Sequence, residues 1–252
     1  MADAAGLALA AGAGVLGGAM NALAGGGSFA TMPTLIALGL PSTVANATSN
    51  VAVQPGAVAS AWAYRRGLAP IGGVGVRPLA AITFTGGLAG SLLLAWTPAT
   101  AFDVIVPWLL LAATIAIALG RHASDWLSTR FVAGPRSLAA GQALLGIYGG
   151  YFGGGVGMML TAMWGLLTGA SPAKLAAPRT LMLAVANTAA TIVFVASGMI
   201  AWALCVPMMA GSIAGGYLGA LVGRRLPPAA IRGWTLLVTV VTTAVFFWRA
   251  YG

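Results

Sequence analysis

Acidic residues, and charges in general, are scarce in this sequence. Only three of the 252 residues are Asp or Glu, and charged residues of both signs make up 6%, whereas a soluble domain carries about 25%. There is one cysteine, Cys205, and one histidine, His122. A single cysteine excludes an internal disulfide and a cysteine-based metal cluster, and the apolar stretches hold no nucleophile beside a base. We therefore expect no bound metal, no cofactor and no enzymatic activity.

Apolar residues fill the space that charges leave. They make up 60% of the chain, and its mean hydropathy is +0.95. A chain of this length has room for about eight apolar helices of ~20 residues. The expected fold is an all-α polytopic membrane protein in the lipid bilayer, with about eight full transmembrane helices and two short broken or re-entrant helices. The expected segments are 5–24, 28–40, 43–64, 76–96, 102–119, 138–152, 158–168, 173–197, 200–222 and 230–248.

Glycine runs interrupt this apolar pattern twice. The first is Gly25-Gly26-Gly27, and the second, Gly153-Gly154-Gly155, follows about 130 residues later. In hydrocarbon, non-helical backbone is tolerated only where it is buried in protein or lines a cavity. Paired, glycine-interrupted short segments at matching positions of two halves are typical of a transporter's binding site. The alternative is a duplicated bundle whose glycines only allow helices to pack closely.

At these residues the chain resembles the sulfite exporter TauE/SafE family, also called the toluene-sulfonate uptake permeases. The first copy of the family motif fits at Gly25–Gly27, Pro33, Leu35, Ala45, Thr48 and Ser49. The second copy keeps Gly153–Gly155 and Gly169, but it has Met163 in place of the proline and Pro178-Arg179 in place of Thr-Ser. The resemblance implies a permease for a small sulfur-containing anion such as sulfite, sulfoacetate or another organosulfonate. The residues themselves indicate only an anion.

Basic residues predict the topology. They cluster at 65–77, 121–136 and 224–232. If each short segment returns the chain to the side it came from, all three clusters face the cytoplasm. This predicts two inverted repeats, 1–120 and 137–252, joined by a cytoplasmic loop at 121–136, in the inner (plasma) membrane with both termini outside. The net charge of +9 would suggest nucleic acid in a soluble protein, but here the basic residues lie between apolar runs, and no nucleic-acid partner is expected.

An inverted arrangement would place the N-termini of the two short helices, near Ser28 and Met158, close together. A helix N-terminus has unpaired N–H groups and about half a positive charge, so the pair favours a small anionic substrate. Ser28 is expected to cap its helix, and the hydroxyls of Thr48 and Ser49 are expected to point to the same place. The predicted substrate-binding residues are Gly25, Gly26, Gly27, Ser28, Thr48, Ser49, Asn50, Gln54, Gly153, Gly154, Gly155, Arg179 and Thr180.

The sequence leaves alternatives open. Arg179 could instead extend to the membrane interface, as long basic side chains near helix ends do. Asn50 and Gln54 could join helices rather than bind a ligand. The whole protein could be a non-transporting receptor or assembly subunit with a transporter-like fold. The direction of transport, the coupling ion and the oligomeric state, a homodimer included, also stay open.

Overall fold

The computed structural model describes residues 3–127, 134–223 and 226–252. In these ranges the chain forms ten α-helices and one short 3-10 helix. They are α1 (Ala4–Ala24), α2 (Ser28–Ala37), α3 (Ser42–Tyr64), η1 (Arg65–Gly67), α4 (Val76–Trp96), α5 (Ala99–Leu127), α6 (Pro135–Tyr151), α7 (Val156–Thr168), α8 (Pro172–Ala196), α9 (Trp202–Gly223) and α10 (Pro228–Tyr251). The expected all-helical class is confirmed for the described residues.

Among the described residues, six helices are long and apolar enough to cross a membrane: α1, α4, α5, α8, α9 and α10. The expected eight also included α3 and α6, which do not reach that standard. α6 has 17 residues, and α3 carries a series of buried polar side chains, among them Asn46 and Asn50. α3 packs against α2, α8 and α9, so its polar side chains lie against protein. The count of eight full spans therefore stays a prediction.

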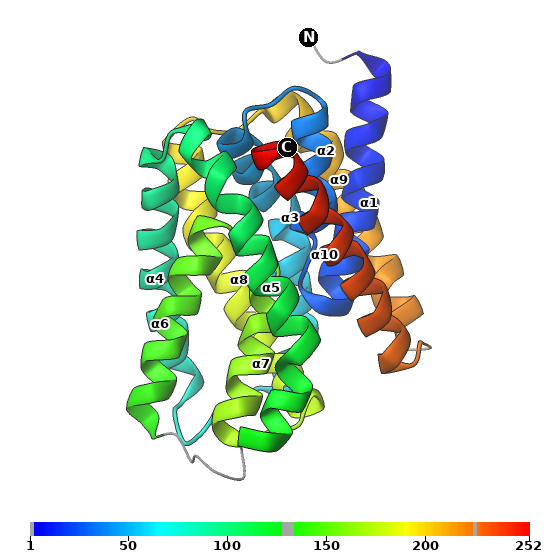
Figure 1. The fold of residues 1–252 in the computed structure, drawn as a ribbon. Helices are drawn as coiled ribbons and strands as arrows, with labels where there is room; N and C mark the ends of the chain where they lie inside the picture. Colours follow the sequence, from blue (N-terminus) through cyan, green and yellow to red (C-terminus); the bar gives the residue numbers. More distant parts are fainter. Residues whose placement is uncertain (1–2, 128–133, 224–225) are drawn as a thin grey trace.

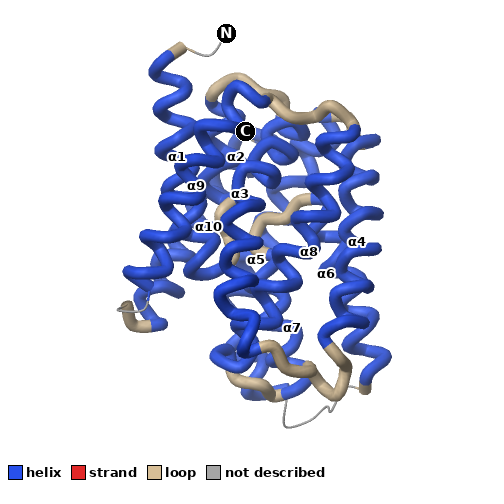
Figure 2. Tube along the Cα trace, turned by 180° about the vertical axis from the view of Figure 1, so that it is seen from behind, coloured by secondary structure: helices blue, strands red, loops and turns tan. Residues whose placement is uncertain are grey.

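Two helices end midway along the bundle, and the chain turns back at both places. α1 comes from the end that holds both termini and α2 returns to that end, whereas α6 and α7 do the same from the opposite end (Figure 1). Figure 2 shows non-helical segments in the middle of the bundle. The two short helices thus begin near the middle and run in opposite directions.

Glycines let two pairs of helices approach closely. α1 packs against α9, and α4 against α6. A Cβ atom on Gly14 or Gly18 would clash with the backbone of α9, and one on Gly90 or Gly150 with the facing backbone in the α4–α6 pair. Small residues four apart are what allow membrane helices to pack backbone to backbone. These contacts hold the outer helices around α3 and α8.

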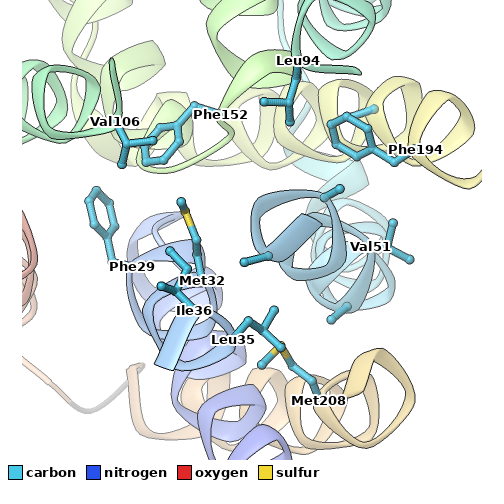
Figure 3. Packing of buried hydrophobic residues seen from close by; sticks show 14 of the residues in the cluster. Phe29, Met32, Leu35, Ile36, Val51, Leu94, Val106, Phe152, Phe194 and Met208 are labelled. Atoms are coloured by element: carbon cyan, nitrogen blue, oxygen red, sulfur yellow. The ribbon is translucent and has the colours of Figure 1, made fainter. Parts of the chain in front are cut away.

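The larger hydrophobic cluster surrounds the turns. Phe29 at the start of α2 and Phe152 just after α6 both belong to it, and both are almost fully buried. Figure 3 shows Phe29 directed toward Val106 of α5 and Phe152. The ends of the broken helices are therefore set in packed protein.

Most helix boundaries fall within three residues of those expected, and α5 differs most. It runs from Ala99 to Leu127, so residues 121–127 of the expected loop are helical. No glycine or proline stands between Gly120 and Gly134, and a helix without such a breaker continues readily. Residues 128–133 and the basic pair Arg224-Arg225 lie outside the described residues. α2 ends at Ala37 rather than at residue 40 because Gly39 adopts a φ of 90° and Pro41 follows.

Candidate functional site

The first break joins α1 to α2. Gly25 ends α1 with a φ of 78°, and its N–H donates to the carbonyl of Asn21 at 2.9 Å. The next three N–H groups, those of Gly26, Gly27 and Ser28, form no hydrogen bond within the described part of the chain. These are the donors that a helix start leaves without partners in its own turn. The break therefore presents unpaired N–H groups in the protein interior.

The expected capping role of Ser28 is wrong. The cap position is held by Gly27, whose φ of −59° and ψ of −33° are already helical, and no side chain caps α2. The helix thus begins one residue earlier than a serine cap would require. Ser28 is instead the first residue of α2, and it is buried.

The second break joins α6 to α7, and like the first it turns where glycine has a positive φ angle and leaves N–H groups unpaired. Gly153 and Gly155 have φ values of 74° and 75°, which favour glycine. The hydroxyl of Tyr148 donates to the Gly154 carbonyl at 2.7 Å and fixes the turn. In the described residues the N–H groups of Gly154, Gly155 and Gly157 form no hydrogen bond. This break also presents unpaired donors.

The two breaks lie in direct contact. A Cβ atom on Gly25 would be 3.2 Å from the Cα atom of Gly157, and one on Gly157 would be 3.4 Å from the Cα atom of Gly25. Gly26 faces the methyl group of Met158, and Gly155 faces the ring of Phe29. Two helix N-termini, each with its partial positive charge, therefore begin on either side of one backbone-to-backbone contact.

Arg179 reaches this contact from α8. Its Cδ atom is 3.7 Å from the position that a Cβ atom on Gly157 would take, and the residue is partly buried. Within the described residues its guanidinium forms no hydrogen bond, and no carboxylate pairs with it. The structure thus places an unpaired cation beside the start of α7.

Ser49 and Thr48, which were expected to point to the same place, face different neighbours. The Ser49 hydroxyl shares a hydrogen bond with the Thr31 hydroxyl of α2. The Thr48 hydroxyl accepts a hydrogen bond from the Ala201 N–H at 3.1 Å, on the α8–α9 connection. Successive residues of a helix point about 100° apart, so the two hydroxyls diverge. Thr180 donates to the Ala177 carbonyl of its own helix at 2.9 Å.

The amides of α3 face α8. The Asn50 amide donates to Asn187 at 3.4 Å, and it also lies against the second break, with its nitrogen 3.2 Å from where a Cβ atom on Gly153 would stand. Gln54, one turn further, donates to the carbonyl of Ala184 and the hydroxyl of Thr188. The side-chain oxygens of Asn50 and Gln54 are buried and have no hydrogen-bond partner in the part of the chain that the structure describes. Asn50 is thus near the breaks, and Gln54 joins α3 to α8.

Sequence reasoning missed Tyr148 and Thr31. Tyr148 stands in the last turn of α6, and its hydroxyl also lies 3.3 Å from the Leu109 carbonyl of α5. Thr31 and its counterpart Thr161 each donate to the carbonyl four residues earlier, at Gly27 and Gly157. The signal that could have found Thr31 is the pairing of the two threonines at the 130-residue offset. Among the described residues no group of three His, Cys, Asp or Glu side chains could hold a metal ion.

Comparisons with known proteins agree with this architecture. The family model described as sulfite exporter TauE/SafE matches residues 10–246. A probable membrane transporter protein YfcA of Escherichia coli (strain K12) is 28% identical over 244 residues, which are 94% of this chain and 88% of the relative. A probable membrane transporter protein of Haemophilus influenzae is 28% identical over 228 residues, covering 89% of this chain and 88% of the relative. No solved structure matches the chain.

Proposed function

Because the chain belongs to the sulfite exporter TauE/SafE family, a family of multi-pass membrane transporters, we propose that it is a permease for one small sulfur-containing anion, such as sulfite, sulfoacetate or another organosulfonate. The anion binds where the two glycine breaks meet. The sulfur in this proposal comes from the family description, and the negative charge comes from the site. The family's activity is transport, and no enzymatic step is proposed.

The observation that carries the proposal is Arg179, a partly buried cation that has no partner among the described residues and lies beside Gly157, where the two breaks meet. A charged side chain inside a membrane protein normally pairs with another group and marks a substrate or ion pathway. An anion between the breaks would pair with the guanidinium, whose fork of donors matches oxyanion geometry. The unpaired N–H groups of Gly26, Gly27 and Gly154 supply further donors. No described carboxylate lies there to favour a cation.

Two inverted repeats, 1–120 and 137–252, explain the packing pattern. The pairing of α1 with α9 is matched by that of α6 with α4, and the contact of α4 with α8 by that of α9 with α3. The two hairpins enter from opposite ends (Figure 1). In such transporters one repeat rocks against the other around a fixed site. The contact of Gly25 with Gly157 is one of the places where the two repeats meet, beside the α1–α9, α4–α6 and α3–α8 pairs.

The basic residues support one orientation in the inner membrane. Arg65, Arg66, Arg77, Arg136 and Lys174 follow α3 or begin α4, α6 and α8, and these element ends lie opposite both termini (Figure 1). Short cytoplasmic connections carry the excess of Lys and Arg. We therefore place this end in the cytoplasm and both termini outside.

Two measurements on purified protein test the function. A thermal-shift screen against sulfite, sulfate, thiosulfate and short sulfonates should show stabilisation by at least one, because a ligand at about 100 times its Kd adds about 2.7 kcal/mol to the native state. Proteoliposomes should then exchange that labelled anion in counterflow. Stabilisation without counterflow would favour the receptor alternative, and no stabilisation by any of these anions would remove the anion site.

A further inference from the structure

A cavity of about 320 Å³ lies at the end of the bundle opposite the termini, apart from the glycine breaks. It is lined by the segment that follows η1 and by the α7–α8 connection. Its walls are mostly apolar, with one hydroxyl and one charged side chain: Gly67, Ala69, Pro70, Ile71, Gly72, Thr168, Ala170, Leu175 and Lys174. Ala69, Pro70 and Lys174 are exposed, so the cavity opens outward.

A tight hairpin forms the inner wall of this cavity. Ile71 and Val74 exchange both backbone hydrogen bonds, at 3.0 and 2.9 Å, and the two glycines between them have positive φ angles, 54° and 79°, as a two-residue hairpin turn requires. The Ile71 side chain is only 4% exposed and belongs to the same buried cluster as Val156, the first residue of α7. The inner wall of the cavity and the start of α7 are therefore parts of one hydrophobic cluster.

One face of α8 connects the cavity with the glycine breaks. Leu175 lines the cavity, Arg179 lies beside Gly157, and Leu183 lies 3.6 Å from the position of a Cβ atom on Gly25. Residues four apart share a helix face and are separated by about 6 Å along the axis. The cavity is therefore about one helical turn from Arg179 and two turns from the contact of the breaks.

We propose that this cavity is a vestibule that takes an organic anion with a small apolar body on its way to Arg179. The proposal rests on the proposed function and narrows its substrate class. The Lys174 ammonium attracts the charged group, and the apolar walls accept the rest of the molecule. A fully hydrated inorganic anion gains little there, because it would lose water against surfaces that offer few donors.

Lys174 makes the vestibule measurable because it is the only lysine of the chain. The full chain, purified in an uncharged detergent, is treated with an uncharged acetylating reagent, and modification is followed by mass spectrometry of the peptides. Arg136→Lys supplies an internal reference, because position 136 is exposed at the same end of the bundle and outside the cavity. Both amines then react in the same molecule under the same ionic strength.

Benzenesulfonate should slow acetylation of Lys174 by about threefold at twice its Kd, since protection follows occupancy, and leave the amine at position 136 unchanged. Sulfate at equal ionic strength should protect neither. If sulfate slowed acetylation of Lys174 as much as benzenesulfonate did, or if benzenesulfonate slowed acetylation at position 136 as much as at Lys174, the effect would be simple charge screening and the vestibule would be overturned. Protection by phosphatidylglycerol but not by benzenesulfonate would assign the cavity to a lipid headgroup and also overturn it.

The outcome separates this proposal from the function on which it rests. If benzenesulfonate stabilises the wild-type protein against heat but not Arg179→Ala, and Lys174 nevertheless stays unprotected, the vestibule fails and the site at the breaks stands. If no anion stabilises the protein and Lys174 is unprotected, both fail. Lys174→Gln should raise the half-saturating concentration for uptake several-fold without lowering the maximal rate, and Lys174→Arg should restore it.

Discussion

The replacement of Arg179 gives the most direct test of the anion site. Its guanidinium has no hydrogen bond or ion pair within the described residues, so Arg179→Ala deprives no other group of a partner. We therefore expect the free energy of unfolding without ligand to change by no more than about 1 kcal/mol. The bound anion, however, loses at least one charge-assisted hydrogen bond, worth about 1.5–3 kcal/mol. That loss corresponds to a rise in Kd of about tenfold to 150-fold.

The assay is ligand-dependent thermal stabilisation of purified variants, with each Kd normalised to folded protein. Arg179→Lys keeps the charge but loses the fork of donors, and it should fall between wild type and Arg179→Ala. Arg66→Ala, at an exposed arginine of η1, is the matched control and should bind as wild type does. An unchanged Kd in Arg179→Ala would show that Arg179 does not bind the anion, and the argument from the unpaired cation would fail.

Three further predictions follow from the geometry. Gly25→Ala should abolish uptake, because a Cβ atom there meets the backbone of Gly157. Gly39→Ala is the control, since Gly39 has a similar φ but open surroundings; it should lose only about 1–2 kcal/mol of stability and keep uptake. Equal uptake by the two variants would contradict this. Tyr148→Phe frees the Gly154 carbonyl and should weaken anion binding at unchanged yield, as measured by thermal shift; wild-type affinity would show that this hydrogen bond does not position the break. In a Cys205→Ser background, single cysteines at positions 137 and 197, both exposed, should label from opposite sides of the membrane, with 137 cytoplasmic; labelling from one side would contradict the orientation.

Much of the fold could be predicted because apolar length and glycine are strong local signals. The predicted helix 76–96 has the observed ends, because Gly75 precedes and the Thr97-Pro98 pair follows a mostly apolar run. Positions of the breaks followed from the glycine runs themselves. α5 is longer than the sequence predicts. Arg121 and His122 favour a loop, but a single glycine such as Gly120 costs a helix only about 1 kcal/mol, and no glycine or proline follows it before Gly134.

The site was harder to predict because side-chain direction depends on tertiary packing. Thr48 and Ser49 adjoin in sequence, and only the positions of α2 and the α8–α9 connection decide which hydroxyl meets which neighbour. Ser28 has a residue type that favours capping, but the helical backbone of Gly27 moved the cap by one residue. Tyr148 gave no local signal, because its role arises from contacts with Gly154 and Leu109 that a single sequence does not reveal.

The contact between Gly25 and Gly157 has a consequence for how substrate range can evolve. Main-chain N–H groups are the same whatever the side chain, so point mutation cannot retune the donors at the breaks; it can only obstruct them. Heritable change in selectivity must therefore come from side chains that border the contact, such as Met158, Phe29 and Arg179. A lineage can exchange one anion for another through these few positions while the glycine breaks stay unaltered.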